Sequence, residues 1–262
     1  MRLFSLALFT LFFSFQSVGV AQAADISRQE LRQAVKELLR DEPEIIMDII
    51  KSNSETILEV AQQGNIQRKR RALVQQWEQD VKTPKNIITQ GRLTRGNPKA
   101  PVTIAVFSDY TCSFCKQAEF LLEVLLETRK NDIKVVFFHY PKENETSIIS
   151  AKYALAASLQ SPEKAWKLHK MFFEQLPEFE ENMDAFITKA CAEIGLDGRQ
   201  LRNDMRNNKT IATLLSENRQ EAERLQITGT PHFFVNDIVV QGLLTAELFE
   251  QAIDMALKLT KK

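Results

Sequence analysis

Apolar side chains recur at helical spacing over residues 26–81, a pattern that predicts helices only. Ser27 and Glu30 have the spacing of a capping box, which marks the start of a first helix. Pro43 stands at a tolerated first-turn position of a second helix, and another capping-box pair, Ser52 with Glu55, precedes a third. The third pattern continues past a glycine and through the basic run at residues 68–71, which we interpret as a solvated helix face.

These helices carry aliphatic faces that a segment of this size buries poorly by itself. The faces are formed by Leu31, Val35, Leu38, Leu39, Ile45, Ile46, Ile49, Ile50, Ile57 and Leu58. We therefore expect residues 26–81 to mediate self-association into a homo-oligomer, with a dimer favoured over a trimer. The alternative is that the helices cap the domain that follows them in the same chain.

Residues 82–101 contain three prolines and two glycines, which is typical of a linker and an entry turn. We therefore divide the chain into a helical N-terminal region, residues 24–84, and a second domain, residues 85–262.

The second domain alternates between strand and helix patterns. The predicted elements are a strand at 102–107, a helix at 112–129, a strand at 133–138, a helical insertion at about 143–225, strands at 232–236 and 238–241, and a helix at 245–259. The last two strands form a hairpin around residues 236–237. Right-handed crossover makes the first two strands parallel neighbours, so the pattern predicts an α/β fold with a mixed sheet covered by helices.

The first residues have the features of a secretory signal peptide. A positive start at Arg2 precedes an apolar run over residues 3–15, and Ala21 and Ala23 match a small-residue cleavage pattern. A membrane anchor is the alternative, but the run is shorter than the roughly 20 residues that span a bilayer. We expect residues 1–23 to be removed near Ala23 and the mature protein to be exported.

The charge balance and the number of cysteines limit which partners and which kind of fold stabilisation we expect. The 262 residues carry 34 basic and 34 acidic side chains, a balance that argues against nucleic acid as a partner. Export usually leads to an oxidising compartment, yet three cysteines do not make a disulfide scaffold. Cys191 lies on the apolar stripe of a predicted helix, which favours a buried thiol over a regulatory or intermolecular one.

Cys112-Ser113-Phe114-Cys115 lies between the first strand of the second domain and the helix that follows it. A helix N-terminus carries partial positive charge and stabilises a thiolate at the first cysteine. A thiolate is the species that attacks another disulfide. The arrangement therefore predicts a redox-active pair.

Three other uses of two cysteines at this spacing fit less well. A c-type haem site needs His after the second cysteine, and this chain has Lys116. A structural zinc site needs four ligands, and only Cys191 and three scattered histidines remain. An inert structural disulfide in so short a loop adds little stability. We predict neither a metal nor a cofactor.

A second motif, Gly229-Thr230-Pro231, immediately precedes the strand at 232–236. Together with the dithiol helix and the helical insertion, it makes the chain from about residue 97 onward resemble the DsbA-like periplasmic thiol–disulfide oxidoreductases of the thioredoxin superfamily. The run from Phe107 to Cys112, with Asp109 three residues before the cysteine, is similar to the Com1-type branch. The resemblance implies a thioredoxin-like fold and a periplasmic location.

The resemblance also implies roles for individual residues. Cys112 corresponds to the exposed nucleophile, and Cys115 corresponds to the more buried resolving cysteine. Thr230 and Pro231 correspond to the loop that holds the extended backbone of a client protein, with a cis bond before the proline. An ordinary trans proline is the alternative.

Other positions depart from the family pattern. A buried Glu often stands six residues before the first cysteine, where this chain has Val106. Asp109 is a candidate proton relay in its place, or a solvated or helix-capping acid. Ser113 and Phe114, which we expect to contact the client, replace the Pro-His pair of the strongest oxidants. The change predicts an intermediate redox potential.

These features predict an enzyme that forms or isomerises disulfides in exported unfolded or misoxidised proteins, with a membrane redox partner that reoxidises it. We expect Phe114, Tyr110, Phe233 and Phe234 to supply apolar client-binding surface, although at least one of the last two belongs to the core of a strand. The alternatives are a dedicated monomeric oxidase and a periplasmic chaperone whose thiol chemistry is secondary.

Overall fold

The computed structural model describes residues 27–142 and 144–260 and divides the chain into two compact units, Met1–Arg68 and Lys69–Lys262. The predicted signal peptide, residues 1–23, lies outside the described residues. None of the helices in the described ranges combines the length and the apolar character that a membrane span requires.

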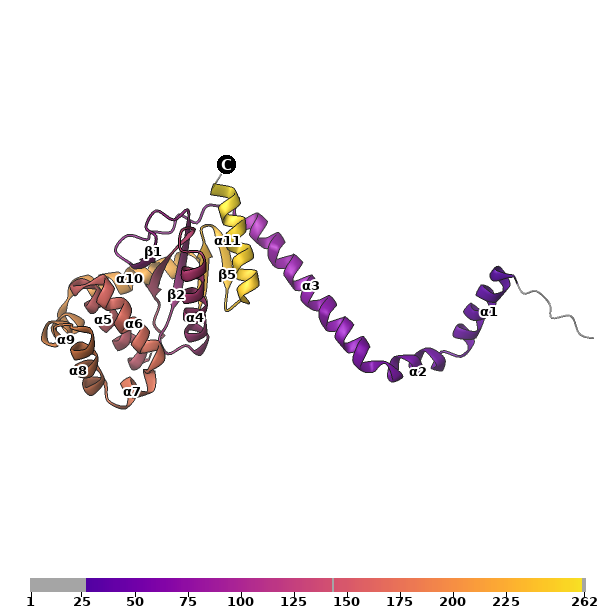
Figure 1. The fold of residues 1–262 in the computed structure, drawn as a ribbon, viewed down its shortest axis with the longest axis horizontal. Coiled ribbons are helices and arrows are strands. Elements are labelled where there is room, and N and C mark those ends of the chain that lie inside the picture. Colours follow the sequence, from indigo (N-terminus) through magenta and orange to yellow (C-terminus); the bar gives the residue numbers. More distant parts are fainter. Residues whose placement is uncertain (1–26, 143, 261–262) are drawn as a thin grey trace, which may run out of the picture. The chain divides into compact units, whose positions relative to one another are not determined.

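The first unit is helical, as predicted. It contains α1 (Arg28–Asp41), α2 (Glu44–Ser52) and the first part of α3 (Ser54–Asp80) (Figure 1). The capping box of α1 is confirmed, because the Ser27 hydroxyl accepts from Glu30 N–H at 3.3 Å and the Glu30 carboxylate accepts from Ser27 N–H at 2.9 Å. The box expected at Ser52 is wrong, since α2 extends through that residue.

The aliphatic faces of the first unit are exposed. The exposed side chains on its helices are Leu31, Val35, Leu38, Ile46, Met47, Ile49, Ile50, Ile57, Leu58, Val60 and Ile66. None of the described residues of α1 and α2 is buried. Exposed apolar side chains in this number form an extended apolar surface on the first unit.

The division between the units falls earlier than the predicted boundary at residues 84 and 85. Helix α3 continues past Arg68, and Trp77, near its C-terminal end, is fully buried in the core of the second unit. The Trp77 indole N–H also donates to the carbonyl of Val239 at 3.1 Å. A buried indole with its N–H satisfied anchors the last turns of α3 to the second unit.

The second unit is built on a five-stranded mixed sheet with the order β1-β3-β2-β4-β5. Its strands are β1 (Leu93–Gly96), β2 (Val102–Ser108), β3 (Ile133–His139), β4 (His232–Val235) and β5 (Ile238–Gln241). Strands β2 and β3 are parallel, as predicted, and the other pairs are antiparallel. Strand β1 lies within the predicted linker, so that prediction is wrong over these residues; Leu93 packs in the core from this short edge strand.

Helices cover both faces of the sheet (Figure 1). They are α4 (Ser113–Thr128), α5 (Glu145–Gln160), α6 (Pro162–Glu174), α7 (Leu176–Glu181), α8 (Met183–Ile194), α9 (Gly198–Asn207), α10 (Lys209–Arg224) and α11 (Ala246–Thr260). The predicted helical insertion is thus confirmed as α5 to α10. Along β2, Ile104 and Val106 face α4 and α11, whereas Ala105 and Phe107 face the side covered by the end of α10. The fold class is therefore α/β.

Trp77→Ala is expected to lower the free energy of unfolding of the second unit by about 3–5 kcal/mol, because it removes a fully buried indole. Chemical denaturation followed by circular dichroism measures the change. The matched control is Ile66→Ala on the exposed part of α3, for which we expect a change below about 0.5 kcal/mol. Equal effects of the two substitutions would contradict the assignment of Trp77 to the core.

Candidate active site

The two cysteines lie where β2 ends and α4 begins. Cys112 is the N-cap residue of α4 and has an extended backbone conformation. Its N–H donates to the carbonyl of Asp109 at 3.1 Å, and its own carbonyl accepts from Lys116 N–H at 3.1 Å. These bonds place both sulfurs at the N-terminal end of the helix, where backbone N–H groups lack helical partners.

Asp109 organises the turn before the first cysteine. Its Oδ1 accepts from the Thr111 N–H at 2.9 Å and from the Thr111 hydroxyl at 3.0 Å, and its Oδ2 accepts from Lys142 N–H at 2.9 Å. The side chain is buried, so the alternative of a solvated acid is wrong. Three donors satisfy the carboxylate and tie the turn to the segment after β3. A role for Asp109 as a proton relay stays a prediction.

Cys112 is the cysteine prepared for nucleophilic attack. A hydrogen bond from the Cys115 thiol is the largest of the influences that lower the pKa of Cys112 from 9.0 to about 5. Burial opposes this shift, and the backbone N–H groups of Cys115 and Phe114 support it. The thiolate is therefore the dominant form of Cys112 at neutral pH.

Cys115 has the opposite character. Its pKa is raised, first by burial and next by its hydrogen bond to Cys112. It is 1% exposed, compared with 6% for Cys112. Cys112 is thus the more accessible of the two, although it is less exposed than expected. An ionised Cys112 is suited to act as the nucleophile, and a protonated Cys115 is suited to act as the resolving thiol.

The loop before β4 faces the first sulfur. The Cys112 Sγ lies 3.4 Å from the carbonyl oxygen of Thr230, and the peptide bond between Thr230 and Pro231 is cis, as predicted. The Thr230 hydroxyl also lowers the pKa of Cys112, although it lacks the alignment of a regular hydrogen bond. The structure therefore brings together two motifs that are 118 residues apart.

The predicted aromatic client surface is only partly present. Phe114 is 59% exposed and Ser113 is exposed beside it. Phe233 and Phe234 both belong to the core, one on each face of β4, and Tyr110 is buried as well. These three residues cannot form the client surface predicted for them, because burial against α11, α10 and β3 already uses their apolar area.

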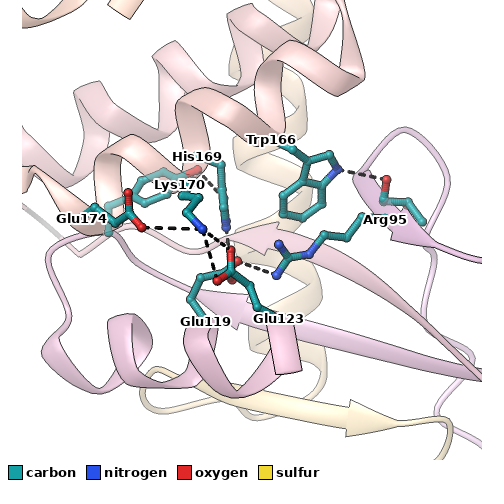
Figure 2. Close-up of polar contacts among 9 residues, drawn as sticks. Arg95, Glu119, Glu123, Trp166, His169, Lys170 and Glu174 are labelled. Atoms are coloured by element: carbon teal, nitrogen blue, oxygen red, sulfur yellow. Dashed lines mark hydrogen bonds and ion pairs between the residues drawn. The ribbon is translucent and has the colours of Figure 1, made fainter. Parts of the chain in front are cut away.

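A buried polar chain beneath the dithiol was not predicted from the sequence. The Tyr110 hydroxyl lies 2.9 Å from His169 Nδ1 and 3.2 Å from His139 Nε2. On its other side, His169 Nε2 is 3.2 Å from a carboxylate oxygen of Glu119, with an alignment poorer than that of a regular hydrogen bond. Figure 2 shows His169 directed at Glu119, which lies on α4.

Arg95 completes this chain at its outer end. Its guanidinium pairs with Glu119 and stacks 4.5 Å from the ring of Trp166, whose N–H donates to the carbonyl of Thr94 (Figure 2). Burial alone raises the pKa of Glu119, but His169 and Arg95 outweigh it and hold the pKa below 4.5. Burial lowers the pKa of His169, so we regard Arg95 as the source of the compensating positive charge.

Cys191 lies apart from this site. It is buried on α8, as the helical spacing predicted, and burial raises the pKa of its thiol. Its sulfur packs against Gly198, at the start of α9. These contacts are those of a small core side chain.

Comparison with known proteins agrees with this geometry. A family model described as Thioredoxin matches residues 89–255. Disulfide bond formation protein D of Bacillus subtilis is 23% identical over 179 residues, which are 64% of this chain and 78% of that protein. The Na(+)/H(+) antiporter NhaA 1 of Mycobacterium is 28% identical over 145 residues, but this match spans only 23% of the antiporter.

Two solved structures show the same fold. A thioredoxin-like oxidoreductase from Silicibacter pomeroyi is 28% identical, with a TM-score of 0.56 over 64% of this chain and 94% of its own. The structure of ScsC from Proteus mirabilis in a transitional conformation is 20% identical, with a TM-score of 0.56 over 91% of this chain and 98% of its own. The second likeness covers so much of the chain that it extends into the N-terminal helices.

The alkylation rate of reduced Cys112 by iodoacetamide is expected to rise with pH through a midpoint near 5. In Cys115→Ala the midpoint should move upward toward 9.0, because the largest stabilising hydrogen bond is lost. Both measurements use the Cys191→Ala background, which removes the one thiol outside the Cys112–Cys115 pair. A midpoint between pH 8 and 9 with Cys115 intact would contradict the geometry of the pair.

Glu119→Gln is expected to destabilise the protein by about 3 kcal/mol at pH 7, because it breaks a buried ion pair and leaves Arg95 without its partner. Since folding lowers the pKa of Glu119, its contribution is present in full above 4.5 and is lost as the pH falls below that value. Thermal unfolding between pH 7 and pH 3 should therefore show a smaller acid destabilisation in the variant than in the original chain. Glu123→Gln, at a half-buried position of the same helix whose carboxylate pairs with the exposed Lys170, is the control.

Proposed function

Because the chain belongs to the thioredoxin family, whose model spans residues 89–255, we propose that it catalyses thiol–disulfide exchange on other proteins through Cys112 and Cys115. One observation carries this proposal. The N-terminal end of α4 holds an ionised sulfur beside a protonated one, and the first sulfur faces the Thr230 carbonyl. A paired nucleophile and resolving thiol is the chemical requirement for exchange.

Exchange proceeds in either direction through a mixed disulfide. In the oxidising direction, a client thiolate attacks the Cys112–Cys115 disulfide at Cys112, and a second client thiol displaces Cys112 to form the client disulfide. In the isomerising direction, the Cys112 thiolate attacks a wrong client disulfide, and another client thiol then rearranges the bond. Cys115 releases the client when no rearrangement occurs.

The client backbone binds along the Thr230–Pro231 loop. The Ser113 and Phe114 side chains are exposed beside the sulfur and supply the polar and apolar parts of the contact. A pocket of about 220 Å³ adjoins the loop and receives a client side chain. It is lined by Tyr140, Pro141, Lys142, Arg219, Thr228, Gly229 and Thr230.

The N-terminal helices join copies of the chain into a homo-oligomer, with a dimer favoured. The exposed aliphatic side chains of these helices support this proposal. Their apolar area is removed from water only if another surface covers it, and a second copy of the chain would provide such a surface. Two or more dithiols in one assembly can hold a misfolded client during repeated exchange. We therefore infer an isomerase activity in addition to oxidation.

The protein acts in the periplasm, where a membrane redox partner reoxidises the dithiol. The signal-like sequence at residues 1–23 supports export, and oxidising conditions there allow disulfides to form. The lowered pKa of Cys112 favours the alternative of a dedicated oxidase, because a stabilised thiolate makes the dithiol more oxidising. An intermediate potential stays a prediction.

Reactivation of scrambled, fully oxidised ribonuclease A tests the proposal. The mature chain is expected to restore ribonuclease activity, and Ile49→Gln with Leu58→Gln should abolish reactivation while oxidation of reduced ribonuclease continues. The two substitutions remove exposed aliphatic side chains and should lower the molar mass measured by light scattering to that of one chain.

The matched control replaces neighbouring polar residues, Lys51→Gln with Glu59→Gln, and should leave both mass and reactivation unchanged. Reactivation by a single-chain variant would show that the helices are only a cap. Cys112→Ser should lose all turnover; suppression of client aggregation without turnover by the original chain would instead identify a chaperone.

A further inference from the structure

The pocket beside the Thr230 loop is lined by two cations. Its volume is about 220 Å³, and Lys142 and Arg219 both contribute to its lining. Lys142 follows β3, Arg219 lies on α10, and both residues are exposed. The other residues that the structure describes in this lining are uncharged at neutral pH. The pocket therefore presents positive charge, which a negatively charged group would complement.

The same pocket adjoins the reacting sulfur. Thr230 belongs to its lining, and the carbonyl oxygen of Thr230 lies 3.4 Å from Cys112 Sγ. A client that is bonded to Cys112 starts at that sulfur, and an extended chain advances about 3.3–3.6 Å with each residue. A client side chain one or two positions away from the attacked cysteine can therefore reach the pocket.

Backbone contacts hold both cationic walls in place. The Lys142 N–H donates to Asp109 Oδ2 at 2.9 Å, and Asp109 organises the turn before the first cysteine. On α10, the side-chain amide of Asn218, the residue before Arg219, donates to the carbonyl of His139 at 3.1 Å. The backbone positions of both cations are thus fixed relative to the end of β3 and to the dithiol turn.

Two acidic residues of α10 near Arg219 are paired with other cations. Glu217 pairs with Arg92 at 3.1 Å, and Glu221 pairs with Arg224 at 2.7 Å. Both carboxylates line a different pocket of the second unit. Neither of them therefore contributes to the lining of the pocket beside the Thr230 loop.

We infer that this pocket binds an acidic side chain of the client, which makes Lys142 and Arg219 specificity-determining residues. The inference rests on the proposed exchange function and names its preferred substrates: clients with Asp or Glu within two positions of a cysteine. A carboxylate accepts charge-assisted hydrogen bonds from both cations, and an amide of the same size gains no charge complementarity. Because both cations are exposed, water and salt keep the preference modest.

The acidic side chain takes no part in the exchange of electrons. The client thiolate attacks Cys112, the bond between Cys112 and Cys115 breaks, and a bond from the client sulfur to Cys112 forms. Cys115 leaves as a thiolate and takes up a proton. The carboxylate occupies the pocket while the mixed disulfide forms, so the contact accelerates this attack.

Reaction of the oxidised full chain with short glycine–serine peptides tests the inference. Each peptide has one reduced cysteine, with Glu or Gln one or two residues away on either side. Acid quenching, alkylation and mass spectrometry give the rate at which the Cys112–Cys115 disulfide opens. At low ionic strength, the Glu peptide is expected to react about 3- to 10-fold faster than the Gln peptide at one of these positions or more. Added salt should lower this ratio.

Variants of the two cations identify the source of the preference. Lys142→Gln with Arg219→Gln should lower the ratio to about 1, and the intrinsic reactivity of each peptide cancels in this comparison. The Gln peptide should keep its original rate. Lys142→Arg retains the charge and should retain the ratio. The matched control, Lys116→Gln with Lys130→Gln, removes two cations outside the pocket and should leave the ratio unchanged.

Lys142→Gln alone should also lower the ratio, which keeps the test decisive if the double variant does not fold. Equal rates for the Glu and Gln peptides at every position in the original chain would overturn the inference. An equal loss of preference in the matched control would do the same, because the overall charge would then be the cause. A disulfide that none of the peptides opens would instead reject the proposed function itself.

Discussion

The negative charge on the Cys112 sulfur is the constraint around which the second unit is arranged. The sulfur is nearly buried, so protein donors must replace the water that would otherwise stabilise a thiolate. The Cys115 thiol and the first N–H groups of α4 supply them from one helical turn. The Thr230 loop approaches from the other side, and it reaches the sulfur because β4 pairs antiparallel with β2. From that loop the Thr230 hydroxyl also lowers the pKa of Cys112, whereas the Thr230 carbonyl is an acceptor and favours the protonated thiol.

A second buried charge, that of Glu119, lies on the same helix, α4. Glu119 lies one turn after Cys115 and is matched by Arg95, which comes from the edge strand β1. Breaking such a pair leaves a charge in a medium that solvates it poorly, so β1, α4 and α6 are bound to one arrangement. Because the charges of Arg95 and Glu119 are opposite, the pair has no net charge. The neighbouring His139 and His169 are neutral, because burial lowers their pKa values. The contacts of Glu119 with Arg95 and His169 fix the position of α4 relative to β1 and α6.

Much of this arrangement could be predicted from local sequence, and the exceptions have physical reasons. Strand and helix periodicity gave β2, β3, β4 and α4 to within one or two residues, and the resemblance gave the cis bond before Pro231. Strand β1 has four residues next to prolines and glycines, too short to show a period. Glu119 and His169 look like ordinary polar positions on two amphipathic helices. Only the packing of α6 against α4 brings them together, and no spacing in one sequence encodes that distance.

The dithiol and the exposed aliphatic side chains of α1, α2 and the first part of α3 belong to different units of the chain. Every donor to Cys112 and Cys115 lies between Ser108 and Thr230, within the second unit, so a single chain contains all the groups for one exchange step. The first unit contributes exposed aliphatic area and, among its described residues, no cysteine. Association through that area would leave the thiol chemistry as it is and raise the effective concentration of a second dithiol near a bound client. Isomerisation, which needs repeated encounters with the same client, is the activity that gains from this.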